Sequence, residues 1–230
     1  MRFDVITIFP RIFDSYFGES ILKRAEEKKL IGVRIHNLRD FSRDKHKKTD
    51  DKPYGGGAGM VMLAEPILRA ADAARRIGKS KKTKIIMLSA KGKQFNQKMA
   101  YDWAKKYDRI IFISGRYEGI DERVVKILRA EEISIGPYVL TDGDVAAMVI
   151  VSAVARLIRG VIKLESLAEE SHWNLLLKKE ADAGAGKGLE YPHYTRPDVL
   201  HYKGKKYRVP SVLLSGDHKR IAEWRRKNAR

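Results

Sequence analysis

The sequence contains no cysteine among its 230 residues. This absence excludes disulfide bonds, zinc sites built on thiolates and a cysteine nucleophile. The N-terminal stretch, MRFDVITIFP, has no long apolar core of the kind found in signal peptides. The most apolar longer segment, residues 145–158, is too short to span a bilayer and contains Ser152 and Arg156. These features are compatible with a reducing compartment, and we expect a cytoplasmic protein.

Acidic residues are scarce relative to basic ones. The chain has 29 Asp and Glu against 47 Lys and Arg, which gives a formal net charge of +18. Such an excess favours a polyanionic partner, because cations neutralise phosphates and release counterions. Nucleic acid is the first expectation and an anionic membrane surface the second, although no basic amphipathic helix with a wide apolar face stands out. A hydrophobic content of 43% is enough for a folded core.

Two common nucleotide-binding motifs are also missing. Residues 55–59 read GGGAG, but this stretch lacks the Gly-Lys-Ser/Thr ending and does not lie between a strand and a helix, as a P-loop must. The dinucleotide fingerprint GxGxxG is absent as well. The glycine-rich stretch therefore predicts a loop that folds over a ligand or an RNA chain.

Short apolar runs alternate with helical patterns over most of the chain, which predicts an α/β fold with a mainly parallel sheet covered by helices on both faces. The predicted strands are residues 3–9, 33–38, 84–88, 109–113 and 132–135. The predicted helices are residues 21–29, 65–76, 96–106, 121–130, 143–158 and 218–227. Ser20 is the expected N-cap of the first helix, and Ser215 or Asp217 that of the last.

Two long loops and a basic tail complete the chain. Residues 40–59 and 163–191 are polar and too long for ordinary connections, which indicates a functional loop or a linker. Residues 196–230 contain 11 Lys and Arg against 3 Asp and Glu. The stretch HYTRP, residues 193–197, combines aromatic and basic side chains between prolines, a composition suited to base stacking and phosphate binding.

The segment SGRYEGIDERV, residues 114–124, follows a buried strand and places five charges within residues 116–123. The carboxyl edge of a parallel sheet is where open α/β folds bind ligands, and Gly115 and Gly119 allow close approach. A second strand-to-loop transition, SIGPYVLTDGD at residues 134–144, offers main-chain groups for an adenine or a ribose. Taken singly, the first segment is more typical of a solvated loop and helix cap, and the second could equally be an ordinary strand-to-helix connection. Arg156, in an apolar helix, either reaches the surface or contacts an anion.

Taken in order, the motifs FP, DDKPYGGGAGM, LSAKG, SGRYEGIDERV, SIGPYVL and PHYTRP resemble the bacterial tRNA (guanine-N(1)-)-methyltransferase (TrmD) family of the SPOUT superfamily. The resemblance runs from the N-terminus to about Gly216. It implies a deep C-terminal trefoil knot in the sheet domain and a homodimer with active sites at the subunit interface. It also implies tRNA as acceptor, S-adenosyl-L-methionine (SAM) as methyl donor and Mg²⁺ assistance. The methyl group would go to ring nitrogen 1 of the guanosine immediately 3′ of the anticodon.

The resemblance carries over a set of site residues. The expected SAM-binding residues form three walls: Met87, Leu88, Ser89 and Ala90; then Gly115, Arg116, Tyr117, Glu118 and Gly119; then Ile135, Gly136, Tyr138, Val139 and Leu140. Arg156 matches the catalytic arginine, and Glu170 falls where the family usually has a catalytic aspartate. Glu169 is the alternative base. No metal-ligand cluster stands out, so no metal-binding residue is predicted.

The chain departs from the family pattern at several places. Glu170 adds a methylene to the expected aspartate, and the stretch between Ser171 and Pro192 is longer than usual. Pro137, Asp142 and Asp144 replace the more usual Asp, Gly and Glu. Asp142 adds a charge near this loop, which is expected to perturb SAM affinity. The C-terminal helical region is expected to be reduced.

The resemblance predicts three parts: a SPOUT methyltransferase domain at residues 1–163, an interdomain linker at 164–192 and a short basic tRNA-binding region at 193–230. Two rival functions stay open at this point. One is an RNA-binding protein that has lost catalysis, and the other is a SPOUT methyltransferase that acts on a different RNA base. The charges of Arg116 and Glu118 are expected to serve either the pocket or the dimer contact.

Overall fold

The structure is a computed structural model that describes residues 1–78, 80, 82–163 and 190–229. The chain divides into two compact units, Met1–Ile162 and Lys163–Arg230, and each is described by itself. The expected base Glu170 and its neighbour Glu169 lie outside the described residues. Within the described residues, no helix combines the length and apolarity that a membrane span requires.

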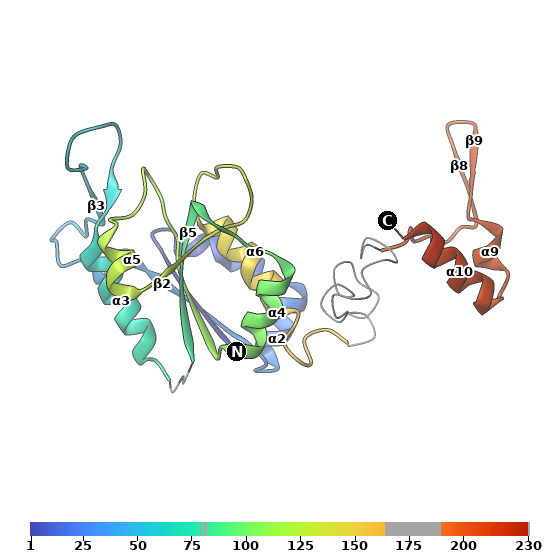
Figure 1. Cartoon of the computed structure of the whole chain (residues 1–230), viewed down its shortest axis with the longest axis horizontal. Helices are drawn as coiled ribbons and strands as arrows, with labels where there is room; N and C mark the ends of the chain where they lie inside the picture. Colours follow the sequence, from blue (N-terminus) through green and yellow to red (C-terminus); the bar gives the residue numbers. More distant parts are fainter. Residues whose placement is uncertain (79, 81, 164–189, 230) are drawn as a thin grey trace. The chain divides into compact units, whose positions relative to one another are not determined.

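A five-stranded parallel sheet forms the centre of the first unit (Figure 1). Its strands are β1 (Arg2–Thr7), β2 (Gly32–Asn37), β5 (Thr83–Gln94), β6 (Arg109–Ile113) and β7 (Glu131–Ser134), in the order β2-β1-β6-β5-β7. Every neighbouring pair is parallel. The sheet confirms the predicted α/β class. A second, two-stranded sheet pairs β3 (Asp50–Asp51), inside the first long loop, with β4 (Val61–Met62), just after that loop.

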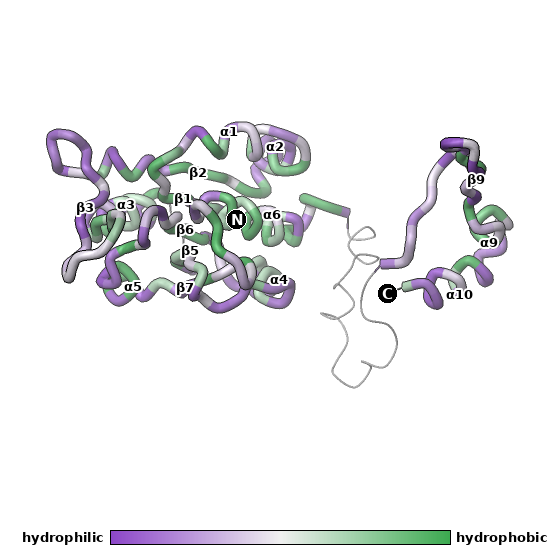
Figure 2. The backbone as a smooth tube through the Cα atoms, turned by 90° about the horizontal axis from the view of Figure 1, so that it is seen from above, coloured by the Kyte–Doolittle hydropathy of each residue, from purple (hydrophilic) through white to green (hydrophobic). Residues whose placement is uncertain are grey.

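Helices cover both faces of this sheet because the strands alternate two sets of apolar side chains. Phe3 and Val5 of β1 belong to one core cluster, whereas Ile6 belongs to the other. The first cluster packs under η1 (Pro10–Phe13), α1 (Asp14–Phe17), α2 (Ser20–Glu27), α4 (Gln97–Lys106) and α6 (Asp144–Ala155). The second packs under η2 (Leu38–Phe41), α3 (Ala64–Arg76) and α5 (Arg123–Leu128). Figure 2 shows the hydrophobic colour along much of α6 and the central strands.

Most predicted elements are confirmed within a few residues, and three details differ. Ser20 is not an N-cap, because it is the first helical residue of α2 and Glu19 occupies the cap position. The fifth predicted helix is shorter, since α5 spans only Arg123–Leu128. Strand β5 does not end at Leu88 but continues to Gln94. In α4, the Asn96 side chain caps the helix by accepting a hydrogen bond from the backbone N–H of Met99.

A group of buried charges fixes the amino end of the sheet, away from the carboxyl ends of the strands. Asp4 is fully buried and pairs with Arg2 at 2.6 Å and with Nε2 of His36 at 2.8 Å. Arg109, which is also buried, lies 3.7 Å from Asp4 and donates hydrogen bonds to the carbonyl groups of Ala74 and Arg75. Those carbonyls close α3, so the cluster satisfies the unpaired end of that helix.

The second unit contains a hairpin and two helices. Strands β8 (Val199–Tyr202) and β9 (Lys205–Arg208) pair antiparallel, and α9 (Ser211–Leu214) and α10 (His218–Asn228) follow. The helix at the C-terminal end confirms the prediction, and its cap is Asp217, which accepts hydrogen bonds from the N–H groups of Lys219 and Arg220. The hairpin was not predicted.

Candidate active site

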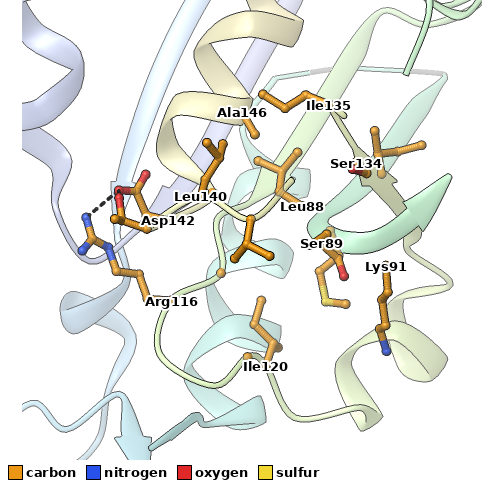
Figure 3. A pocket seen from close by; sticks show the side chains of 18 of the residues that line it. Leu88, Ser89, Lys91, Arg116, Ile120, Ser134, Ile135, Leu140, Asp142 and Ala146 are labelled. Carbon is orange, nitrogen blue, oxygen red and sulfur yellow. Dashed lines mark hydrogen bonds and ion pairs between the residues drawn. The ribbon is translucent and has the colours of Figure 1, made fainter. Parts of the chain in front are cut away.

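A pocket of about 470 Å³ opens at the carboxyl ends of β5, β6 and β7 (Figure 3). These three strands are neighbours in the sheet, so the loops that follow them meet at one edge. The pocket is lined by Met87, Leu88, Ser89, Ala90, Lys91, Gly115, Arg116, Tyr117, Glu118, Gly119, Ile120, Ile133, Ser134, Ile135, Tyr138, Val139, Leu140, Thr141, Asp142, Gly143 and Ala146. Its volume lies in the range of small-molecule sites, roughly 300–1,000 Å³.

All of the expected SAM-binding residues line this pocket except Gly136. Three segments that are far apart in the sequence are therefore brought together. Gly136 lies instead beneath the ring of Tyr138, where an added Cβ would stand 2.2 Å from a ring carbon. In Figure 3, Leu88, Ile135 and Leu140 supply apolar side chains, while Arg116 and Asp142 form an ion pair at one side.

The first wall is a bulge in β5. Leu88 and Lys93 both align with Ile133 of β7, so the four residues between them loop out of the ladder. Gly92 closes the bulge directly against β7, where an added Cβ would lie 2.5 Å from the backbone of Glu132 and Ile133. The bulge turns Ser89 and Ala90 toward the pocket, which is a common use of bulges near functional sites.

The second wall is joined to the glycine-rich loop. The backbone N–H of Glu118 donates to the carbonyl of Met60 at 3.0 Å, and the N–H of Met62 donates to the carbonyl of Gly119 at 2.9 Å. Glu118 also packs directly against Gly59. Residues 55–59 therefore lead into a segment that supports the pocket wall.

The third wall crosses the second at Gly143. Its N–H donates to the carbonyl of Gly115 at 3.0 Å, and an added Cβ at position 143 would lie 2.9 Å from the backbone nitrogen of Gly115. Only glycine permits this approach. The crossing brings the loop after β7 into direct contact with the loop after β6, and α6 begins at the next residue.

Asp142 has its carboxylate engaged within the chain. It pairs with Arg116 at 3.1 Å and accepts hydrogen bonds from the N–H groups of Asp144 at 2.8 Å and Val145 at 3.3 Å. Those two N–H groups belong to the first turn of α6, where they lack partners in the helix. Arg116 also lies 4.2 Å from the ring centre of Phe9. The added charge at position 142 thus joins two pocket walls through an ion pair.

Asp144 is a buried carboxyl group beside the ion pair of Arg116 and Asp142. Its side chain is fully buried and lies 3.7 Å from Arg116. Burial raises the pKa of Asp144, and the neighbouring Asp142 raises it further. The hydroxyl groups of Ser114 and Thr7, together with Arg116, act in the opposite direction on this pKa.

Arg156 follows the last residue of α6 and is partly buried. Ala146, near the start of α6, lines the pocket. At a rise of 1.5 Å per residue, the two Cα atoms are about 15 Å apart along the helix axis. Within one chain, the pocket and Arg156 therefore lie at opposite ends of α6.

The sequence predictions missed several residues that line the pocket. Lys91, Ile120, Ile133, Ser134, Thr141, Asp142, Gly143 and Ala146 also line the pocket. Most of them flank the predicted segments, so their position in the sequence was the available signal. Among residues 1–78, 80, 82–163 and 190–229, no group of three or more histidine or acidic side chains is arranged to hold a metal ion.

Comparison with known proteins gives the same assignment over the full length. The family model for tRNA (Guanine-1)-methyltransferase TrmD matches residues 1–230. A tRNA (guanine-N(1)-)-methyltransferase of Thermomicrobium roseum is 51% identical over 230 residues, which cover 100% of this chain and 79% of the relative. The enzyme of that name from Carboxydothermus hydrogenoformans is 48% identical, covering 100% of this chain and 83% of the relative. The one from Clostridioides difficile is also 48% identical and is covered to 92%. The chain belongs to the tRNA (guanine-1)-methyltransferase TrmD family.

Proposed function

We propose that this protein transfers a methyl group from SAM to ring nitrogen 1 of guanosine in tRNA. The full-length family match carries this assignment, because relatives with about half of their residues identical are named for the reaction. The finer part of the proposal is the position of the base, the guanosine immediately 3′ of the anticodon, which rests on the motif resemblance. Either rival function would conflict with the close match to these relatives.

The pocket is the proposed SAM site. Its size suits a cofactor of that class, and its walls combine apolar side chains with main-chain groups at the ends of three strands. Leu88, Ile120 and Leu140 offer apolar contact, and Glu118 is an acidic group in the lining. When bound, SAM supplies an electrophilic methyl group. Among the described residues, no cluster of three or more histidine or acidic side chains is arranged for Mg²⁺, and we assign no step to that ion.

Glu170 and Arg156 are the proposed catalytic residues. Ring nitrogen 1 of guanine becomes nucleophilic when its proton leaves, and a carboxylate within reach can accept that proton, typically raising the rate by about 10²–10⁴. Negative charge then moves to the exocyclic oxygen, where a fixed cation such as Arg156 stabilises it. Glu169 remains the alternative base.

The proposed homodimer follows from the distance between Arg156 and the pocket. An arginine about 15 Å along α6 from the pocket lining is too far to reach it within the same chain. A second copy packed on α6 would supply Arg156 across the interface. The surface supports this arrangement, because Val145 and Val149 of α6 are each 42% exposed and lie one helical turn apart. Phe9, Ile12 and Tyr16 add exposed apolar side chains.

The proposal also includes a trefoil knot and a separate role for each of three segments of the chain. A trefoil knot is supported by the crossing of Gly143 over Gly115, which brings the loops after β6 and β7 into contact. We propose that residues 1–163 form the methyltransferase domain, that 164–192 link it to the second unit, and that 193–230 bind tRNA. The basic composition of residues 196–230 supports the last assignment.

Methyl transfer from radiolabelled SAM to unmodified tRNA transcripts tests the function, followed by mapping of the methylated nucleotide. The expected product is 1-methylguanosine immediately 3′ of the anticodon, and no product forms on a transcript in which that guanosine is replaced by adenosine. Methylation of another base, or SAM binding without any transfer, would overturn the proposal.

Variants of the two proposed catalytic residues separate chemistry from cofactor binding. We expect Glu170→Gln to abolish most turnover, and Arg156→Ala to lower it, while the Kd for SAM stays close to that of the wild type. Near-normal turnover of Glu170→Gln would shift the role of base to Glu169 or elsewhere. An equal loss of turnover and SAM affinity in Arg156→Ala would instead assign that residue to cofactor binding.

A further inference from the structure

The hairpin formed by β8 and β9 has an unusual composition. Residues 199–208 read VLHYKGKKYR and contain four Lys and Arg, one histidine, two tyrosines and no acidic residue. Lys203 and Gly204 form the turn, both with positive φ, of 47° and 74°. A cluster of cations without any carboxylate to balance it is suited to a polyanion.

The pairing register sorts these side chains onto two faces. Leu200 pairs with Tyr207, and Tyr202 pairs with Lys205, so these four side chains share one face. This aromatic face is open, since Leu200, Tyr202 and Tyr207 are 52%, 59% and 52% exposed. The opposite face, here called the basic face, pairs His201 with Lys206 and Val199 with Arg208.

The hairpin projects from a unit that gives it little cover. None of residues 190–229 is buried, and a two-stranded hairpin alone is only marginally stable in water. The backbone tie at its base is the hydrogen bond from the N–H of Val209 to the carbonyl of Asp198, at 2.9 Å. Packing within the described residues therefore does not account for the exposed rings of Tyr202 and Tyr207 on this hairpin.

We propose that this hairpin is an RNA-contacting element: the aromatic face stacks on an unpaired base of the tRNA, and the basic face contacts phosphates. Aromatic side chains that alternate with cations are how single-stranded segments of RNA are held, because every base offers a flat ring for stacking. This inference rests on the proposed function and assigns a defined part of the tRNA grip to residues 199–208.

The aromatic face is tested with a pair of double variants. Tyr202→Ser combined with Tyr207→Ser removes both rings and should raise the Kd for unmodified tRNA about 5- to 150-fold, the range expected for one stacked base. Tyr202→Phe combined with Tyr207→Phe keeps the rings and should restore the affinity to within a few-fold of wild type. Equal affinity of the serine pair and the wild type would overturn stacking. Equal loss in both pairs would assign the effect to the hydroxyl groups and would also overturn it.

The basic face is tested by the salt dependence of tRNA binding. Lys206→Ala combined with Arg208→Ala should lower the slope of log Kd against log salt concentration by about 1.5, as expected when two phosphate contacts are lost. The charge-matched control is Lys28→Ala combined with Lys98→Ala, which removes two exposed lysines of the first unit. A control slope that falls as much as the hairpin slope would overturn a specific role for the basic face.

Two further measurements separate this inference from the proposed function. All hairpin variants should bind SAM like the wild type, as measured by calorimetry, and should recover most of their turnover at saturating tRNA. If the wild type itself fails to methylate tRNA, the proposed function is wrong. If the wild type methylates tRNA and the serine pair binds it equally well, only the hairpin proposal is wrong. Dissociation of an oligomer by the serine pair, seen by size exclusion with light scattering, would reassign the face to contact between copies.

Discussion

Single residues beside the pocket show how charge is used inside this chain. Arg116 and Asp142 pair across two walls, and Asp142 also accepts hydrogen bonds from the first turn of α6. The sequence predicted that both residues lie near the SAM site, but it did not predict that their charges pair with each other. Their partnership joins positions 26 apart in the chain, so only the fold reveals it. Asp142 therefore stabilises the loop from Tyr138 to Gly143 through contacts within the chain.

Asp144 should make stability depend on pH in a defined direction. Burial raises the pKa of its carboxyl group in the folded state above the unfolded value, so the native state binds its proton more tightly. Between the two pKa values, this group lowers the free energy of unfolding as pH rises, with a slope of at most about 1.4 kcal/mol per pH unit. Asp144→Asn removes the titration. The free energy of unfolding of the variant minus that of the wild type should therefore increase with pH across this window and level off above it.

Urea denaturation of both proteins at a series of pH values from about 3.5 upward measures this difference, since the ordinary pKa of aspartate is about 3.9. Other titrating groups are common to both proteins and cancel. A difference that decreases as pH rises would mean that Arg116 dominates and that the folded-state pKa is lowered.

At the scale of elements, the bulge in β5 makes the first pocket wall. The sequence predicted a strand ending at Leu88, because the apolar run stops there. The strand continues to Gln94 because β7 pairs with it again beyond the bulge, with Gln94 aligned to Ser134. Only the backbone of Gly92 fits against Glu132 and Ile133. A run of apolar residues reveals a buried strand, but it carries no information on such a long-range backbone contact.

Gly92→Ala should destabilise the first unit. Its new Cβ would stand 2.5 Å from the backbone of β7, so the strands must separate locally. We expect a loss of about 1–3 kcal/mol in the free energy of unfolding, the usual cost of overpacking, together with weaker SAM binding. Denaturant unfolding and calorimetry measure the two effects.

Gly32→Ala is the matched control for this change. Gly32 begins β2 on the same sheet, and nothing lies within 4 Å of the position of an added Cβ. Its substitution should change stability by less than about 0.5 kcal/mol and leave SAM affinity unchanged. Comparable losses in the two variants would mean that the effect comes from glycine replacement in strands and not from the bulge.

The hairpin β8–β9 shows a different limit of sequence reasoning. Its signal was present, since Lys203-Gly204 separates two short runs that contain β-formers. The runs also carry many lysines, so the segment was interpreted as part of a basic tail that leads into a helix. By contrast, the five strands were predictable because apolar runs are strong local signals, and the pocket loops at residues 114–124 and 134–144 because glycines mark those strand ends. The strand order was not predicted, and the wall at residues 87–90 was expected only from the family resemblance.

At the scale of the whole molecule, α6 runs from the pocket to Arg156 and presents two exposed valines, Val145 and Val149, in its first half. Asp substitutions at Val145 and Val149 would place two charges on that strip, where each side chain is 42% exposed in the single chain. We expect the double variant to be folded but monomeric, and to lose more than about 10-fold in methyl transfer, because the interface and the site fail together. Light scattering, circular dichroism and the transfer assay measure these properties.

Ile127→Asp provides the comparison for that variant. Ile127 is an apolar residue of α5 that is 61% exposed, and α5 covers the other face of the sheet from α6. This variant should keep the oligomeric state and the activity of the wild type. A wild-type protein that is monomeric and fully active would refute the shared site.

Mixing two variants of low activity tests whether the pocket and Arg156 come from different copies. One variant is Arg156→Ala, and the other is Gly115→Val, whose new side chain would stand in the pocket lining. In a mixed dimer with shared sites, one site contains both changes and the other contains neither, so the second site works. Random pairing makes half of the dimers mixed, and activity should return to about one quarter of the wild-type value after coexpression. If each chain instead builds its own site, every site in the mixed dimer carries one of the two changes. Activity then stays at the level of the separate variants. In that case Arg156 would have to reach the pocket of its own chain, although about ten residues of helix place Ala146 and Arg156 about 15 Å apart.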